Sequence, residues 1–551
     1  MRKWNAVLWI FVAMLCLATQ LVASDAVIKG TVTDNAGKPI RGAIVRATLG
    51  NKSVTRYSQN DGRYEMTLPA GTYSVSVLAF GFGAKSENKD ATQAGDTNFS
   101  LSPKWDIAHL SGAEVGRLIP DDTQGNLLKA SCDGCHDFAI VMRRRGQTAA
   151  EWKSFLPNMT AGRRPNPTFS PDRLNALSDA LEKYFGPNSP YLGPDADPPT
   201  AEQVNHPAVA DAALKATIRE YDIPTGVDAF AHSIWLDHDS KTAWFSEIGL
   251  RANKIGSFDI DTETFHEYPV PTPGSSPHTG VVGLDGRVWT TLASAGHNLI
   301  VLDPETGTMK EYNCPPADRC GGHTVSLDKA GNIWVSGGGS GQFTEFDVKA
   351  EKFKNYKFPV PAAYPEGSSG LWNQIPGEPE RVNLSTYHVT VDSTGKVWGS
   401  ILSSGMVVSL DPATGETKEY QAAGVSGLRG LVADSHDNIW FSDWYHHRLG
   451  KLDPKTGAFK LYNPPTPGAA PYGIVEEKKT GYIWYADMSG NNITRFDPKT
   501  EKFTEFPLPS RPSYPRFIDV AKDGRVWFSE YWAGKIGVLN SGDDAKMASA
   551  K

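Results

Sequence analysis

A tryptophan recurs seven times over residues 244–527 of this 551-residue chain. Consecutive copies are separated by 45, 45, 64, 42, 44 and 43 residues, and each lies in a short apolar run next to polar, turn-forming residues. A unit of about 40–50 residues with four short strands is typical of a β-propeller blade. The repeat therefore predicts a seven-bladed β-propeller over residues 218–541, followed by a tail over residues 542–551. The seven positions are Trp244, Trp289, Trp334, Trp398, Trp440, Trp484 and Trp527.

Length and charge limit the remaining possibilities. A chain of 551 residues is too long for one hydrophobic core, so several domains are expected. The 53 glycines and 38 prolines favour many short strands joined by tight turns, and hence a mainly β protein. The net charge of -7 and the absence of a long Lys/Arg run exclude nucleic acid as an expected partner.

The N-terminal segment has the three parts of a secretory signal. The basic residues Arg2 and Lys3 precede an apolar run over residues 6–17, and small residues precede Asp25. This run is shorter than the ~20 residues that a membrane span needs, which favours a cleaved signal over a membrane anchor. We expect residues 1–24 to be removed, leaving a periplasmic or secreted protein without a transmembrane segment.

Residues 27–103 alternate apolar and polar side chains between Gly- and Pro-containing turns, which predicts a small antiparallel β-sandwich. The run from Gly30 to Ala47 and the segments Asp61–Tyr64 and Gly71–Val75 resemble the carboxypeptidase regulatory-like domain. The resemblance implies a transthyretin-like fold. It also implies a non-catalytic adaptor role.

Helical periodicity replaces this alternation over residues 104–192, and a Pro-rich linker follows over residues 193–217. Within the helical part, Cys132, Cys135 and His136 have the spacing of a c-type haem attachment site. Two thiols one helical turn apart can reach both vinyl groups, and the adjacent His can then coordinate the iron. A redox Cys pair, half a zinc site and a disulfide are weaker alternatives, because the first needs a βαβ context and the second a further ligand pair. The motif predicts a covalent haem c.

The flanking segments Leu128–Ser131 and Thr148–Trp152 also resemble small cytochrome c domains. The resemblance implies an all-α cytochrome c domain over residues 104–192, with Met159 opposite His136 as the second axial ligand. Methionine as sixth ligand leaves no open position on iron, so electron transfer is the expected role. The alternative is that Met159 only fills the core.

A second candidate site comes from the residue near the start of each predicted inner strand. These positions should surround the mouth of the central channel, where propellers commonly bind ligands. The Trp-bearing strand runs antiparallel to the inner one, so its end returns to the same face and adds a ring of carboxylates. In blade order the inner-strand residues are His232, His278, His323, His388, Arg429, Tyr472 and Arg516, and the carboxylates are Glu247, Asp443, Asp487 and Glu530.

Two interpretations of this ring stay open. The side chains could recur only because the blade recurs, each bonding its neighbour. Alternatively, imidazoles gathered at a channel can share protons near neutral pH or bind a divalent metal. A metal ion held by His232, His278, His323 and His388 is one expectation for this face.

The repeat resembles the streptogramin B (virginiamycin B) lyase family, through Trp244–Glu247, Asn253–Gly256, Glu267–Pro273 and Pro277–Gly280. The resemblance spans about 320 residues. It implies opening of a cyclic depsipeptide ester by elimination, with a His base and a Mg²⁺ held by Glu. His278 matches the base position of the family.

The family's Glu two residues before its catalytic His is replaced here by Ser276. The other three histidines of the ring lack that Glu as well, because Phe230, Gly321 and Thr386 occupy the corresponding place. The missing carboxylate argues against the metal, and hence against the lyase reaction of the family.

Cys314 and Cys320 flank a short Pro-containing loop just before His323. In an oxidising compartment these two residues are expected to form a local disulfide. It would make the rim beside the histidines more rigid.

Three functions follow from these features. In the favoured one the chain is an oxidoreductase-type protein, whose propeller binds a small-molecule substrate or a redox partner protein while the haem carries electrons. The second is a carbon-oxygen lyase of the streptogramin type with the helical domain as an accessory. The third is a non-catalytic binding module.

Overall fold

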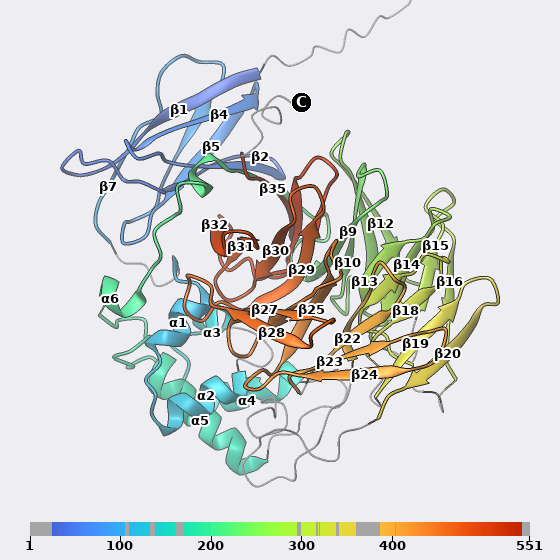
Figure 1. Cartoon of the computed structure of the whole chain (residues 1–551). Coiled ribbons are helices and arrows are strands. Elements are labelled where there is room, and N and C mark those ends of the chain that lie inside the picture. Colours follow the sequence, from blue (N-terminus) through green and yellow to red (C-terminus); the bar gives the residue numbers. More distant parts are fainter. Residues whose placement is uncertain are drawn as a thin grey trace, which may run out of the picture.

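The computed structural model describes residues 25–542 except for 105–108, 133–137, 161–169, 198, 295–298, 316, 317, 319, 338–340, 360–385 and 403. Its described part is mainly β-structure, with a β-sandwich, a short helical segment and a ring of four-stranded blades (Figure 1). The expected mainly β fold with a propeller is confirmed. The predicted signal segment, residues 1–24, and all but the first residue of the predicted tail lie outside the described residues.

The N-terminal domain is a sandwich of two β-sheets. One has the strand order β4-β1-β7, and the other contains β3, β2, β5 and β6 side by side. Alternate residues of β4 are buried, as expected for a strand with one face on a core, and Leu68, Val45 and Val75 belong to that core. The strands are β1 (Asp25–Asp34), β2 (Ile44–Leu49), β3 (Lys52–Tyr57), β4 (Arg63–Pro69), β5 (Thr72–Leu78), β6 (Lys85–Asp90) and β7 (Phe99–Leu101).

The propeller has seven blades of four antiparallel strands, counted from the inner strand outward. The first four are β9 (Ala231–Leu236), β10 (Thr242–Glu247), β11 (Lys254–Asp259), β12 (Thr264–Pro269); β13 (Pro277–Val282), β14 (Val288–Leu292), β15 (Leu299–Leu302), β16 (Met309–Tyr312); β17 (Val325–Leu327), β18 (Ile333–Val335), β19 (Gln342–Asp347), β20 (Lys352–Lys357); and β21 (Thr386–Val391), β22 (Val397–Ile401), β23 (Met406–Leu410), β24 (Thr417–Gln421). The last three are β25 (Leu428–Ala433), β26 (Ile439–Asp443), β27 (Arg448–Asp453), β28 (Ala458–Tyr462); β29 (Pro471–Glu477), β30 (Tyr482–Asp487), β31 (Asn492–Asp497), β32 (Lys502–Pro507); and β33 (Pro515–Val520), β34 (Val526–Glu530), β35 (Lys535–Asn540) with β8 (Thr217–Asp222).

Each recurrent tryptophan lies on the second strand of its blade and packs against the next blade. Trp334, for example, is buried with Val389 and Val397 of the fourth blade. Full burial of a large apolar side chain is worth about 1.5–3 kcal/mol, so seven such contacts hold neighbouring blades together. Four of the indoles also donate Nε1–H to a carboxylate at the end of the preceding strand. These pairs are Trp334 with Asp328, Trp398 with Asp392, Trp440 with Asp434 and Trp484 with Glu477, at 3.1, 2.8, 2.8 and 3.0 Å.

Strand β8 closes the ring and joins it to the sandwich. It precedes the first blade in sequence but pairs with β35 of the last blade on one edge and with β3 of the sandwich on the other. The result is one eight-stranded sheet with the order β33-β34-β35-β8-β3-β2-β5-β6. Ile218 of β8 is buried in a cluster that includes Ile44 and Tyr57 of the sandwich and Leu539 of the propeller. The sandwich is therefore held to the propeller by backbone hydrogen bonds and a shared core.

The segment between the sandwich and β8 corrects the expected all-α cytochrome c domain. In the portion of the chain that the structure covers, only four helices reach seven residues. The helices of this segment share a core of their own side chains, among them Phe138, Trp152, Leu177 and Tyr184. Such short helices form an attachment to the propeller and not a separate all-α domain, so that prediction is wrong. The helices are α1 (Gly112–Leu118), α2 (Thr123–Cys132), α3 (Phe138–Met142), α4 (Ala149–Thr160), α5 (Pro171–Phe185) and α6 (Ala201–Val204), with short 3-10 helices η2 (Ala213–Lys215) and η3 (Gly226–Ala229).

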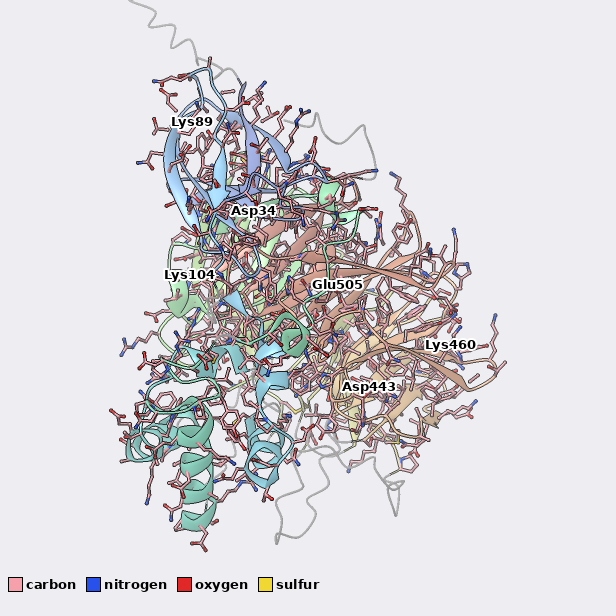
Figure 2. All side chains as sticks on the ribbon, turned by 90° about the vertical axis from the view of Figure 1, so that its left-hand side faces the viewer. Asp34, Lys89, Lys104, Asp443, Lys460 and Glu505 are labelled. Carbon is pink, nitrogen blue, oxygen red and sulfur yellow. A yellow bond between two sulfur atoms is a disulfide. The ribbon has the colours of Figure 1, made fainter. Side chains whose placement is uncertain are left out.

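Helix α1 attaches this segment to the sixth blade. The backbone N–H of Ala113 donates to Ser489 O at 2.9 Å, and the Arg117 guanidinium donates to the carbonyls of Pro467 and Val204. Figure 2 shows the sandwich, labelled at Lys89 and Asp34, at one end of the molecule and the helices at the other, with the propeller beside both. None of the helices whose placement is described is long and apolar enough to cross a membrane.

Candidate functional site at the propeller mouth

The side chains predicted from the inner strands come together at one end of the propeller. His232, His278, Arg429, Tyr472 and Arg516 each occupy the second position of their inner strand. In six of the seven blades the pairing of the first two strands shifts register near this end. Such bulges bend a strand and re-aim its side chains. We call this set, together with His323, Tyr387 and His388, the propeller mouth.

Three histidines of consecutive blades have their rings in contact at the mouth. The ring centroids of His232 and His278 are 3.9 Å apart, and those of His278 and His323 are 4.1 Å apart. The row of rings continues from His323 to Tyr387, whose ring centroids are 4.1 Å apart. The planes of these three pairs of rings are tilted by 42°, 43° and 47°, so the rings are in contact but are not parallel. His388 lies farther along the circle of blades, and its ring centroid is 6.0 Å from that of Phe517.

Backbone carbonyls fix the tautomers of two of these histidines. Nδ1 of His278 lies 2.8 Å from His323 O, and Nδ1 of His323 lies 2.8 Å from Tyr387 O. A carbonyl only accepts, so Nδ1 must carry the proton in both rings. Nε2 then holds a free lone pair in the neutral imidazole. The Nε2 atom of His232, the neighbouring histidine, is buried and has no hydrogen-bond partner within the described ranges.

Burial keeps all four histidines neutral. It lowers the pKa of His278 to about 3 and that of His388 to about 4. Burial, followed by the charge of His278, also lowers the pKa of His232 and His323 well below the usual value. Desolvation disfavours the charged imidazolium, and the nearby arginines add to the effect. At neutral pH these rings are bases and hydrogen-bond acceptors, not cations.

Positive charge at the mouth comes from two arginines that stack on aromatic rings. The Arg429 guanidinium lies 4.5 Å from the ring centre of Tyr387 and 4.9 Å from that of Trp444. The Arg516 guanidinium lies 4.1 Å from Tyr531 and 5.4 Å from Tyr472. Burial lowers the pKa of Arg516, but the surrounding tyrosines raise it by more, so the group stays charged. Cation–π contacts of this kind are strongest where water is excluded.

The apolar wall of the mouth was missed in the sequence, although it follows a simple rule. The residue four positions after the blade tryptophan contributes to this wall in five blades, and these residues share one buried cluster with Tyr387, Tyr472, Tyr514 and Phe517. The repeat spacing alone could have identified them. They are Ile248, Leu402, Trp444, Met488 and Tyr531.

The expected ring of carboxylates beside the mouth is not formed. Asp487 accepts hydrogen bonds from the backbone N–H of Ala470 at 2.7 Å and of Gly490 at 2.9 Å. Asp443 accepts from the backbone N–H of Ser426 and pairs with Arg448. Successive side chains of a strand point to opposite faces, so the residue before each wall position turns away from the mouth. Asp443 and Asp487 are thus bonded to loop amides, and among the described residues neither is bonded to a histidine of the mouth.

The metal and haem expectations are also corrected. Within the described ranges no group of three or more His, Cys, Asp or Glu side chains is arranged to hold a metal ion. At the propeller mouth, Nδ1 of His278 and Nδ1 of His323 are each bonded to a backbone carbonyl, which leaves fewer nitrogens for a metal. Of the residues expected to hold haem c, Cys132 is partly buried at the end of α2, whereas Cys135, His136 and the Met159 side chain lie outside the description. Without the all-α domain expected around them, the assignment of haem c is withdrawn.

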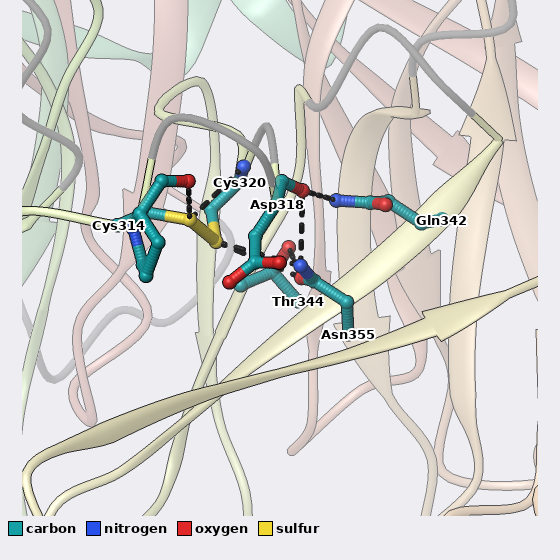
Figure 3. The surroundings of a disulfide bond; sticks show 7 residues. Cys314, Asp318, Cys320, Gln342, Thr344 and Asn355 are labelled. Atoms are coloured by element: carbon teal, nitrogen blue, oxygen red, sulfur yellow. Dashed lines mark hydrogen bonds between the residues drawn. A yellow bond between two sulfur atoms is a disulfide. The ribbon is translucent and has the colours of Figure 1, made fainter.

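Cys314 and Cys320 form a disulfide beside the third blade (Figure 3). The loop that they close is bonded to two strands of that blade, since Asp318 O accepts from Gln342 Nε2 at 2.8 Å and from Asn355 Nδ2 at 3.0 Å. The disulfide thus fixes the approach to His323.

Comparisons with known families cover two parts of the chain. Residues 379–548 match the Virginiamycin B lyase family, and residues 27–102 match the carboxypeptidase regulatory-like domain. A search of curated proteins finds no match.

Solved lyase structures share the propeller fold. A streptogramin B lyase structure superimposes with a TM-score of 0.51 at 23% identity, over 60% of this chain and 99% of that one. Selenomethionine-substituted virginiamycin B lyase from Staphylococcus aureus gives 0.50 at 20%, over 59% and 99%. The catalytically inactive histidine-to-alanine lyase of the same organism, with quinupristin, gives 0.50 at 19% over the same shares. The chain thus carries a virginiamycin B lyase-like propeller domain behind a carboxypeptidase regulatory-like N-terminal domain.

Proposed function

We propose that the propeller mouth is the active site of a carbon-oxygen lyase that acts on an ester-containing substrate. One observation carries this proposal: the neutral, Nδ1-anchored imidazole of His278 lies in a site whose positive charge comes from Arg429 and Arg516. The match to the Virginiamycin B lyase family over residues 379–548 supports the reaction class. The disulfide supports action in an oxidising compartment outside the cytoplasm.

The proposed reaction is an elimination in which His278 is the general base. Its Nε2 lone pair takes a proton from the carbon next to a carbonyl group. The electron pair of that C–H bond becomes a C=C bond, and the C–O bond of the ester breaks to release a carboxylate. The two guanidinium groups stabilise the negative charge that develops on oxygen, which is the usual role of fixed cations in such sites.

The pKa of about 3 has two opposite effects on this base. It keeps Nε2 unprotonated at every physiological pH, but it also makes the imidazole a weak base, because general bases work best with a pKa near the operating pH. Negative charge that develops on the substrate would stabilise the imidazolium product of the proton transfer. The arrangement therefore favours substrates with an acidic C–H group.

The test is opening of quinupristin by the full chain, with His278→Asn as the active-site variant. His266→Asn is the matched control, since His266 is exposed on the outer strand β12. We expect His278→Asn to reduce kcat/KM by about 10²-fold or more, in the range typical of a general base, and His266→Asn to leave it unchanged. Equal rates for both variants would refute the assignment of His278.

A non-catalytic binding module is the second candidate. It is favoured by Asp487, which binds loop amides instead of lining the mouth, and by Ser276 at the place of the family's Glu. In this case quinupristin would bind to the wild-type chain and be recovered unchanged after long incubation. Arg516→Met would weaken that binding, because it removes a fixed cation from the mouth.

A further inference from the structure

A cavity of about 220 Å³ lies where the sandwich, the linker before β8 and the sixth-to-seventh blade loop meet. Its walls come from Ile40 and Phe80 of the sandwich, His206 and Val209 of the linker, and Arg511 of the propeller, with His109 at the start of the helical segment. Ligand pockets usually measure about 300–1,000 Å³, and a water molecule takes about 30 Å³. The cavity is thus large enough for a small organic molecule and too small for a cyclic peptide.

The lining is mostly apolar, and besides Arg41 it includes a second cation, Arg511. Its Nη1 donates to His109 O at 2.8 Å, and its Nε is buried with no hydrogen-bond partner among the residues described. A buried guanidinium N–H without an acceptor lowers the stability of the fold. A carboxylate is the acceptor that best matches the paired, coplanar N–H groups of a guanidinium. The unused Nε therefore indicates an anionic ligand.

Neighbouring charges limit that ligand to a single negative charge. Glu114 is buried close enough to influence Arg511, but it is already bonded by His206 Nδ1 at 2.5 Å and by the backbone N–H of Ser111 at 2.7 Å. A second negative charge in the cavity would be repelled by this carboxylate. Arg41, the other cation of the lining, pairs with exposed Asp211 at 2.6 Å.

Most of the remaining cavity wall is apolar. The rings of Phe80 and His206 stack with centroids 4.0 Å apart and planes 5° apart, which holds the linker against the sandwich. Ile40, Phe82 and Val209 complete an apolar surface. Burial of apolar area here would add about 25 cal/mol per Å² to binding.

We propose that this cavity binds a small organic monocarboxylate, with the carboxylate on Arg511 and the apolar part between Phe80, Ile40 and Val209. The site is separate from the propeller mouth. Because three parts of the chain form its walls, the bound acid would tie the sandwich to the propeller.

The test is calorimetric titration of the full chain with phenylacetate, using neutral phenylacetamide of the same shape as the comparison probe. We expect saturable binding of one phenylacetate and binding of the amide that is weaker by about tenfold or more, since hydrogen bonds to charged groups are the stronger ones. Equal affinity of acid and amide would overturn the proposal, as would the absence of saturable binding.

Two arginine variants show whether phenylacetate binds in this cavity or at the propeller mouth. Arg511→Met should lose the preference for the acid, whereas Arg516→Met at the propeller mouth should keep it. The reverse pattern, or loss in both variants, would overturn the proposal and place the acid elsewhere. Val209→Phe fills the cavity without changing its charge, so it should also weaken phenylacetate binding by about tenfold or more if Arg511→Met does not fold. Unchanged affinity in Val209→Phe would contradict the site.

Discussion

Tyr387 and Tyr472 share a hydrogen bond of 2.5 Å between their hydroxyl oxygens, although they are 85 residues apart and belong to the fourth and sixth blades. Both rings are buried, and each is capped by a different arginine, Tyr387 by Arg429 and Tyr472 by Arg516. The pair therefore links two non-adjacent blades and holds both cations of the propeller mouth in place.

Removal of either hydroxyl should destabilise the protein. Tyr472→Phe or Tyr387→Phe leaves the partner hydroxyl buried without its bond, so each variant should lose about 1 kcal/mol of unfolding free energy. The double variant should lose less than the sum, because the second substitution removes a group that is already unpaired. Urea unfolding of all four proteins measures this coupling, and strictly additive losses would contradict the bond.

The buried carboxyl of Glu247 gives a pH-dependent prediction. Burial, with the charge of Glu267, raises the pKa of Glu247 from 4.5 to about 7. The folded protein then holds a proton that the unfolded chain releases, so wild-type stability falls as pH rises through this window. Glu247→Gln cannot release this proton, so its unfolding free energy does not fall in this window. The difference in unfolding free energy between the variant and the wild type should therefore grow with pH and level off above about pH 7, after a change of up to about 3 kcal/mol. Unfolding free energies across this range, with exposed Glu305→Gln as control, test the slope; a constant difference would contradict it.

Strand β8 should couple the stability of the sandwich to that of the propeller. Ile218→Ala leaves a cavity in the core that both share, at a cost of about 2–5 kcal/mol. Hydrogen exchange should become faster in β3 and β35 together. Ile28→Ala, in the core of the sandwich alone, should accelerate exchange in the sandwich strands only. Accelerated exchange on just one side of β8 in Ile218→Ala would contradict the shared core.

The histidines of the propeller mouth should not titrate near neutral pH. Burial lowers the pKa of His278 to about 3 and that of His388 to about 4, so both should keep the ¹⁵N shifts of a neutral imidazole down to about pH 5. In His278 the protonated nitrogen should be Nδ1. Nuclear magnetic resonance of selectively labelled protein measures both properties. A midpoint near 6.5 for His278 would show that the mouth is more hydrated than the contacts indicate.

The parts of the fold that repeat were predictable from sequence, and the parts that depend on distant pairing were not. Tryptophan spacing identified the blades because each indole performs the same packing role. Position within the inner strand identified His232, His278, Arg429, Tyr472 and Arg516 for the same reason. The role of β8 could not be predicted, because its two partners lie about 160 and 320 residues away in sequence.

Predictions from short sequence motifs were wrong where the position of a side chain depends on the surrounding fold. Asp443 and Asp487, each three residues after a blade tryptophan, were placed at the correct end of the blade, but alternation along the strand turns them to the loops. Tyr387 was overlooked in favour of its neighbour His388, because a register shift between Thr386 and His388 lets both residues reach the mouth. The cysteine motif implied a whole domain that the short helices do not form.

Product mass is the most direct test of the central claim that the propeller mouth catalyses an elimination. Incubation of quinupristin with the full chain, followed by mass spectrometry, should give a linear product of unchanged mass with a new C=C absorbance, and His278→Asn should give none. A product heavier by one water molecule would show hydrolysis, and unchanged quinupristin would show a binding module. Either result would contradict the lyase assignment.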